Sequence, residues 1–280
     1  MDNFDIYKLK TAGLTNQQVI NVLEYAEIRE KELSVKDMAV VSECRNPALF
    51  IEKYLQLDDD LLRQEFEKFP SFSILEDVYP WDLSEIYNPP VLLFYKGNLD
   101  LLKLPKVAVV GSRNSSRVGS QSVQKIIKEL NNELVIVSGL ARGIDTSAHM
   151  AALQNGGRTI AVIGTGLDVF YPRANKKLQS YLGEHHLVLS EYGPEAEPLK
   201  FHFPERNRII AGLCRGVIVA EAKMRSGSLI TCERAMEEGR DVFAIPGSIL
   251  DGKSDGCHHL IQEGAKCIKS GSDVLSEFDF

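Results

Sequence analysis

The sequence predicts an α/β protein in which a doubly wound parallel sheet follows a small all-helical domain. Six short apolar segments, KVAVVG, LVIVSG, TIAVIG, LVLSEY, GVIVAEA and DVFAIPG, are each followed by a loop rich in Gly, Ser or Pro and then by a helical pattern. Nearly continuous apolar strands that alternate with helices are typical of a parallel sheet covered on both faces. We expect the helical domain over residues 1–72 and this extended Rossmann-type domain over residues 73–280.

Capping patterns predict the helices of the first domain. Thr15 and Gln18 form a capping-box pattern before apolar residues at helical spacing. Pro47 stands at a first helical turn, and Asp58 can cap the helix after it. A stretch rich in proline and aromatic residues, with one short strand VLLFYKG, should join the two domains.

Composition favours a cytoplasmic protein without disulfides, metals or cofactors. Hydrophobic residues make up 44% and charged residues 25% of 280 residues, and no apolar run approaches the roughly 18 residues of a membrane span or a signal peptide's core. The five cysteines form no C-x-x-C pair. Cys257, His258 and His259 are consecutive, so they cannot all face one ion from a helix.

The charge distribution changes what the net charge implies. A formal net charge of −7 argues against a nucleic-acid partner. Residues 1–70, however, carry 14 acidic and 9 basic side chains, so most of the excess lies in the helical domain. Residues 103–128 hold six Lys or Arg and no carboxylate. A local basic patch on an otherwise acidic protein is therefore possible.

The loop after the first strand departs from a dinucleotide-binding turn. Gly111 permits the tight turn, and Ser112 and the first amides of the next helix can donate to an anion. Arg113 stands where a dinucleotide site has its second glycine. Its guanidinium can grip a phosphate bidentately, but its bulk prevents close approach of pyrophosphate to the backbone. The loop therefore favours a phosphate that lies outside the turn.

Two further loops at the same predicted sheet edge combine cations with aromatic rings. They supply Arg173, Lys176 and Lys177, and then Lys200, Arg206 and Arg208 with Phe201 and Phe203 interleaved. Cations beside stackable rings suit single-stranded nucleic acid. The segment RSGSLIT is a second anion-competent turn before a helix. Asp145 and His149, four residues apart, are interpreted as a cap and a packing residue rather than an acid–base pair.

These motifs together resemble one family. VAVVGSRNSSRVG, IVSGLARGIDTSAHMAAL, TIAVIGTGLDVFYPRAN, LSEYGP, FHFPERNRIIAGL and VAEAKMRSGSLITCERAMEEGRDVFAIPGS follow one another as in the DNA-processing protein A family, DprA or Smf. The helical start resembles the sterile-alpha-motif-like domain of members from transformable Gram-positive bacteria such as streptococci. The chain stops before the winged-helix domain of many relatives, so no function of that domain is expected.

The resemblance implies a non-enzymatic role and a set of site residues. Such proteins bind and protect incoming single-stranded DNA in natural transformation, load the RecA recombinase onto it and act as homodimers. The residues that would contact DNA are Gly111, Ser112, Arg113, Arg173, Lys200, Phe201, Asn207 and Arg208. A dimer surface is expected on the helix CHHLIQEGA, with His258 and Ile261.

Two other functions stay open at this point. Enzymes of the same Rossmann class cleave the base from nucleoside monophosphates and carry Pro-Gly-Gly-x-Gly-Thr-x-x-Glu. In this chain Thr231 falls where the catalytic glutamate would stand, and Glu233 lies two residues too far along. A non-catalytic module that senses free nucleotides is the second alternative.

Overall fold

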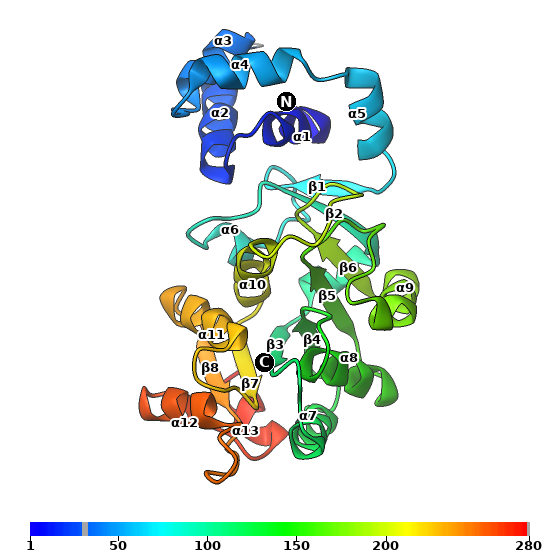
Figure 1. The fold of residues 1–280 in the computed structure, drawn as a ribbon, viewed down its shortest axis with the longest axis vertical. Helices are drawn as coiled ribbons and strands as arrows, with labels where there is room; N and C mark the ends of the chain where they lie inside the picture. The colour runs from blue at the N-terminus through cyan, green and yellow to red at the C-terminus, as the bar shows by residue number, and fades with distance from the viewer. Residues whose placement is uncertain (30–32, 279–280) are drawn as a thin grey trace.

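The computed structural model describes residues 1–29 and 33–278, and Figure 1 shows a group of helices seated at one end of a long α/β layer structure. No helix in these two ranges is long and apolar enough to cross a membrane. The helices before the sheet are α1 (Asn3–Thr11), α2 (Asn16–Arg29), α3 (Val35–Val41), α4 (Pro47–Leu55) and α5 (Asp59–Phe66).

The capping patterns of this helical region are confirmed. Gln18 Oε1 accepts from the Thr15 amide at 2.9 Å, and Thr15 Oγ1 accepts from the Gln18 amide at 3.3 Å. Pro47 is the first residue of α4. The Asp58 carboxylate accepts two amide hydrogens at the start of α5. Local sequence thus determines where these helices begin.

The nine-stranded sheet confirms the doubly wound α/β class. Its order is β1-β2-β6-β5-β4-β3-β7-β8-β9, and the strands from β6 to β9 are parallel. The strand VLLFYKG forms β2, which pairs antiparallel with β1 and β6. The strands are β1 (Ser71–Ser73), β2 (Leu92–Gly97), β3 (Lys106–Gly111), β4 (Val135–Ser138), β5 (Thr159–Ile163), β6 (Leu187–Ser190), β7 (Gly216–Ala220), β8 (Asp241–Ala244) and β9 (Lys266–Cys267).

Helices cover both faces of this sheet. Val107 and Val109 of β3 pack with α7, α8 and α13, whereas Ala108 and Val110 face the layer that includes α10 and α11. This alternation is the period of two that a strand imposes. The covering helices are α6 (Trp81–Ser84), η1 (Leu99–Lys103), α7 (Arg117–Glu129), α8 (Ile144–Gln154), η2 (Arg173–Asn175), α9 (Lys176–His185), α10 (His202–Gly212), α11 (Gly227–Glu237), α12 (Asp255–Gln262) and α13 (Gly271–Leu275).

The helical region shares a hydrophobic core with the sheet. Tyr7 and Phe66 lie with their rings 5.4 Å and 5.7 Å from the ring of Phe94 in β2. The same cluster of buried side chains continues to Val188 in β6. The helical region is therefore packed directly on the antiparallel end of the sheet, as Figure 1 also shows.

The chain reverses its direction of winding beside β3. The strands β4, β5 and β6 follow on one side of β3, and β7 and β8 lie on the other. Ligands of doubly wound sheets bind where this reversal occurs, outside the carboxyl ends of the strands. The loops after β3 and β7 therefore meet at the position where a binding site is expected.

Candidate nucleic-acid interface

Two adjoining cavities lie at the carboxyl edge of the parallel strands. The first, of about 410 Å³, lies between the β3–α7 loop and the start of α11, and includes Gly111, Ser112 and Asn207 in its lining. The second, of about 440 Å³, includes Arg142, Tyr171 and Arg173. The residues common to both linings are Arg113, Ala141, Phe203 and Arg206. We call these two spaces the first and second cavities.

Arg113 stands at the junction of the two cavities. Its side chain is exposed, and its guanidinium carbon lies 5.4 Å from the centroid of the Phe203 ring. The Phe203 ring in turn lies 5.4 Å from the ring of Tyr171. A guanidinium held against an aromatic face keeps its donors free for an oxyanion. The junction thus offers both a phosphate-binding group and stackable rings.

Arg206 is one of the cations that the sequence analysis named in this loop, but it was not among the residues expected to contact DNA. Its side chain is only 4% exposed, and Nη1 donates to the carbonyl of Val162 at 2.6 Å. Burial lowers the pKa of this guanidinium to about 10, although the nearby Asp145 carboxylate opposes that shift. A Cβ on Gly139 would lie 1.8 Å from Nη1, so the site requires a glycine there. Arg206 therefore places a fixed cation in the shared wall.

Asp145 has a structural role in the loop before α8. Its side chain is 8% exposed, and Oδ2 accepts from the Ala141 amide at 3.3 Å. Burial raises the pKa of this carboxyl, whereas the Arg206 guanidinium acts in the opposite direction. The cap of α8 itself is Gly143, with no side-chain hydrogen bond. Asp145 thus closes the loop rather than capping the first turn, which corrects our expectation.

Two amides at the start of α7 already have acceptors within the protein, which reduces what this turn offers to a phosphate. The Ser116 amide donates to Glu221 Oε2 at 2.6 Å, and the Gly119 amide donates to Ser116 Oγ at 3.0 Å. Glu221 follows β7 directly and is 6% exposed. A buried carboxylate therefore occupies the positive end of this helix dipole. Arg113 remains outside this turn.

The start of α11 agrees better with the prediction of an anion-binding turn at RSGSLIT. Ser226, Gly227 and Ser228 line the first cavity, and Lys223 lies beside them. The amides of Gly227 and Ser228 have no protein acceptor in residues 1–29 and 33–278. Unpaired amides at a helix start can donate to an oxyanion. The first cavity is thus lined by possible anion donors on both sides.

The predicted DNA residues separate into two groups. Gly111, Ser112, Arg113 and Asn207 line the first cavity, and Arg173 lines the second. Lys200 and Phe201 are exposed and line neither cavity, and Phe201 is the residue immediately before α10. The aromatic ring in the shared wall is that of Phe203 instead.

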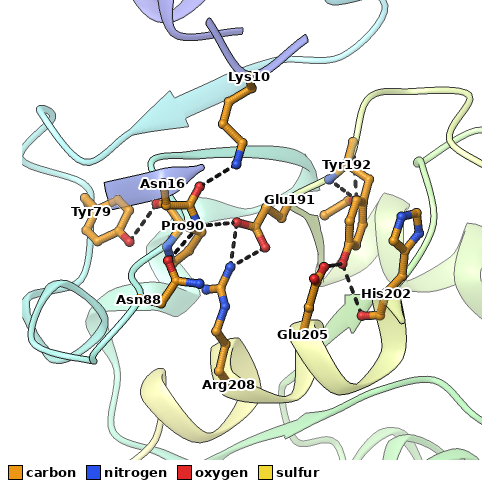
Figure 2. Close-up of polar contacts among 11 residues, drawn as sticks. Lys10, Asn16, Tyr79, Asn88, Pro90, Glu191, Tyr192, His202, Glu205 and Arg208 are labelled. Carbon is orange, nitrogen blue, oxygen red and sulfur yellow. Dashed lines mark hydrogen bonds and ion pairs between the residues drawn. The ribbon is translucent and has the colours of Figure 1, made fainter. Parts of the chain in front are cut away.

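Arg208, also predicted to contact DNA, is paired within the protein and lines neither cavity. Its Nη2 donates to both carboxylate oxygens of Glu191, at 2.6 Å and 2.5 Å, and its side chain is 12% exposed. Figure 2 shows the side chain rising from α10 toward Glu191 and the helical region, and Arg208 is absent from the lining of both cavities. Residues two apart on a helix point in nearly opposite directions, so Arg206 and Arg208 serve different sites.

The cations of residues 103–128 do not all gather at the cavities. Lys106 is 7% exposed and donates to the carbonyls of Leu102 and Leu104. Lys103 is paired with Asp100 at the opposite end of β3. These cations are distributed from η1 through β3 to α7, and Arg113 is the cation among them that lines the cavities.

The two proposed dimer residues lie on α12. His258 Nε2 lies 3.1 Å from the carbonyl oxygen of Gly247, and Ile261 is half-buried against the core under α12. Both positions remain predictions for an interface between two copies of the chain.

His149 is the packing residue that the sequence suggested. It is fully buried, and its Nδ1 lies 2.7 Å from Thr159 Oγ1. The Thr159 hydroxyl donates to the carbonyl of Ile136 at 2.7 Å, so His149 Nδ1 must carry the hydrogen of this contact. The other ring nitrogen is buried and has no hydrogen-bond partner in the part of the chain that the structure describes. Burial therefore lowers the pKa of His149 to about 3, with Arg206 adding to the effect.

This histidine should make the fold sensitive to acid. Below pH 6.5 His149 takes up a proton in the unfolded chain, whereas in the folded protein it stays neutral down to about pH 3. The free energy of unfolding therefore decreases as pH falls through this window. We expect the free energy of unfolding in urea to fall by about 2 kcal/mol between pH 7 and pH 5 from this group alone. The variant H149Q should lack this component. Parallel pH profiles for the two proteins would contradict the assignment.

Comparison with known proteins identifies the family. The model of DNA recombination-mediator protein A matches residues 71–279, and the DNA processing protein A sterile alpha motif domain matches residues 1–62. The chain belongs to the DNA processing protein A family. It is 77% identical to DNA processing protein DprA of Streptococcus pneumoniae over 278 residues, which is 99% of each chain. The Bacillus subtilis protein is 50% identical over 201 residues, 71% of this chain and 68% of that one.

Solved structures of the DNA processing protein A family have the same fold. The X-ray structure of the Streptococcus pneumoniae protein superposes with a TM-score of 0.98 at 76% identity, covering 100% of this chain and 99% of that one. The Helicobacter pylori protein, whose structure is described for its single-stranded DNA binding mode, gives a TM-score of 0.67 at 30% identity. It covers 75% of this chain and 98% of that one. Family membership and sterile-alpha-motif and Rossmann-like architecture are thereby established.

Proposed function

We propose that this protein binds single-stranded DNA at the two cavities, protects it during natural transformation and presents it to the RecA recombinase. It acts in the cytoplasm as a homodimer, without a catalytic step. The observation that carries the proposal is the Arg113 guanidinium over the Phe203 ring where the cavities meet. The single-stranded DNA binding described for the Helicobacter pylori relative supports it.

The chemistry of the cavities supports a strand rather than a single nucleotide. Arg113, Arg142 and Arg173 line the second cavity, and Lys223 with the α11 amides lines the first. Cations in successive positions can follow a phosphate backbone, and rings between them can stack on bases. Thr231 lines the first cavity, and Glu233 is exposed outside it, so this segment supplies no carboxylate to the cavity for glycosidic cleavage.

A titration with a labelled oligonucleotide at several salt concentrations tests this function. The logarithm of affinity should fall with the logarithm of salt concentration at about −0.7 per phosphate neutralised, which gives about −2 for three arginine contacts. A mononucleotide competitor should displace the strand only weakly. A shallow slope, together with mononucleotide binding as tight as that of the strand, would instead support a nucleotide sensor.

Phe203 rather than Phe201 should carry the base-stacking contribution. We expect F203A to lower oligonucleotide affinity by about 1 to 3 kcal/mol, because its ring lies in the shared wall of the cavities. The matched control is F201A, since that ring is 57% exposed and outside both cavities. Binding should be measured at constant salt after both variants are shown to be folded. A larger loss for F201A than for F203A would overturn the assignment.

A further inference from the structure

We infer that the helical region positions α10, and with it part of the DNA site, through Asn16, Glu191 and Arg208. This inference rests on the proposed function. The residues that line the two cavities all fall between Val110 and Thr231. Asn16 therefore acts on the site through other side chains and is a positioning residue.

The connection is a short chain of buried polar contacts, seen in Figure 2. Asn16 Nδ2, at the start of α2, donates to Glu191 Oε1 at 2.8 Å and to Asn88 Oδ1 at 3.3 Å. Lys10 Nζ donates to Asn16 Oδ1 at 2.8 Å. Glu191 in turn accepts from Arg208 on α10. Helices α1 and α2 are thus linked to α10 through a single carboxylate.

Burial makes these contacts interdependent. The Glu191 and Arg208 side chains are only 8% and 12% exposed, and Asn16 is 4% exposed. A buried ion pair is favourable only when the remaining polar atoms also find hydrogen bonds. Asn16 supplies such a bond to the carboxylate. Losing it removes one hydrogen bond to the Glu191 carboxylate, and we expect the Glu191–Arg208 pair to shift in response.

Helix α10 transmits such a movement because it carries both sets of residues. Arg208 faces the helical region, whereas Phe203, Arg206 and Asn207 line the cavities from the same eleven-residue helix. Its first turn is held separately by the Tyr192 hydroxyl, which donates to the His202 carbonyl at 3.1 Å. A helix fixed at one end by Tyr192 and further along by Arg208 has a defined tilt. Weakening the second contact should change how Asn207 and Phe203 meet the DNA.

The first test uses two variants of Asn16 in the full chain. N16D keeps the shape and the oxygen that faces Lys10 but sets a carboxylate against Glu191. We expect oligonucleotide affinity about tenfold weaker for N16D and about threefold weaker for N16A. The salt slope should stay unchanged, because Arg113, Arg142 and Arg173 are not on α10. The matched control is S42A, which removes a buried hydrogen bond to Ala39 within the helical region and should bind normally.

A double-mutant comparison separates positioning from general destabilisation. N16A combined with N207A should bind about threefold better than the product of the single losses predicts, because both act through α10. The loss of affinity for N16A combined with R173A should equal the product of the two single losses, because Arg173 is on η2 rather than on α10. The titrations are done at a temperature where thermal unfolding shows every variant folded.

The possible results have distinct meanings. Wild-type affinity for N16D and N16A, with a steep salt slope in every protein, overturns this inference and leaves the proposed function intact. Losses in S42A as large as in N16A, or equal coupling of N16A to N207A and R173A, also overturn it, because they indicate general destabilisation. A wild-type protein without salt-dependent strand binding contradicts the proposed function itself.

Discussion

Replacing Gly111 by alanine is expected to destabilise the protein by about 3 kcal/mol or more. An added Cβ would lie 1.9 Å from the backbone oxygen of Ala220 and 2.8 Å from Cγ1 of Ile144. Ala220 is the direct partner of Gly111 in the β3–β7 ladder. Because the obstructing atom is backbone in a central strand pair, β3 and β7 must separate to relieve the clash. Urea unfolding at pH 7 measures the loss.

A second glycine of the same site provides the control. Gly227 also lines the first cavity, but an added Cβ would meet no atom within 4 Å. It opens α11, where alanine is a better helix former than glycine. G227A should therefore unfold within about 0.5 kcal/mol of the parent protein. Equal unfolding free energies for G111A and G227A would show that β3 and β7 tolerate the extra carbon.

The sequence was sufficient for features that depend on neighbouring residues or on burial of both sheet faces. The capping box of Thr15 and Gln18 is closed within four residues. The strand ending at Gly111 is apolar at successive positions because side chains on both of its faces are covered by helices. Such features are encoded locally, so the fold class and the helix starts could be read without coordinates.

The missed site residues depend on how distant segments meet. Phe201 and Phe203 lie close together in the sequence, but α10 begins at His202, and its packing places Phe203 in the shared wall of the cavities while Phe201 stays exposed. Whether Arg206 or Arg208 faces the cavities depends on how α10 packs against β5 and the helical region. No residue close to either arginine in the sequence determines that packing.

The charged partner of a helix start likewise cannot be predicted from neighbouring residues, as Glu221 shows. A helix start after a glycine turn usually implies an open anion site. Here the carboxylate that occupies it comes from 105 positions along the chain. Glu221 is adjacent to Ser116 only because β7 is placed next to β3. Sheet order, rather than the local motif, decides that an internal carboxylate lies at the start of α7.

Arg113 should then dominate the electrostatics of DNA binding. We expect R113A to bind a labelled oligonucleotide about tenfold to a hundredfold more weakly at moderate salt, the loss of one hydrogen-bonded charge. The negative salt slope should also become shallower by about 0.7, because one fewer phosphate is neutralised. Stability should change little, since the side chain is exposed. Fluorescence anisotropy at four or five salt concentrations gives both quantities.

Two further variants separate the charge of Arg113 from its shape. R113K keeps the charge but loses the planar fork over Phe203, so the salt slope should persist while affinity falls by an intermediate amount. K125A removes an exposed cation of α7 that is paired with Glu129 and lines neither cavity, and should bind normally. If K125A lowered the slope as much as R113A, the DNA would follow α7 rather than the cavities. Equal slopes for R113A and the parent protein would remove Arg113 from the phosphate path, and with it the observation on which the proposed function rests.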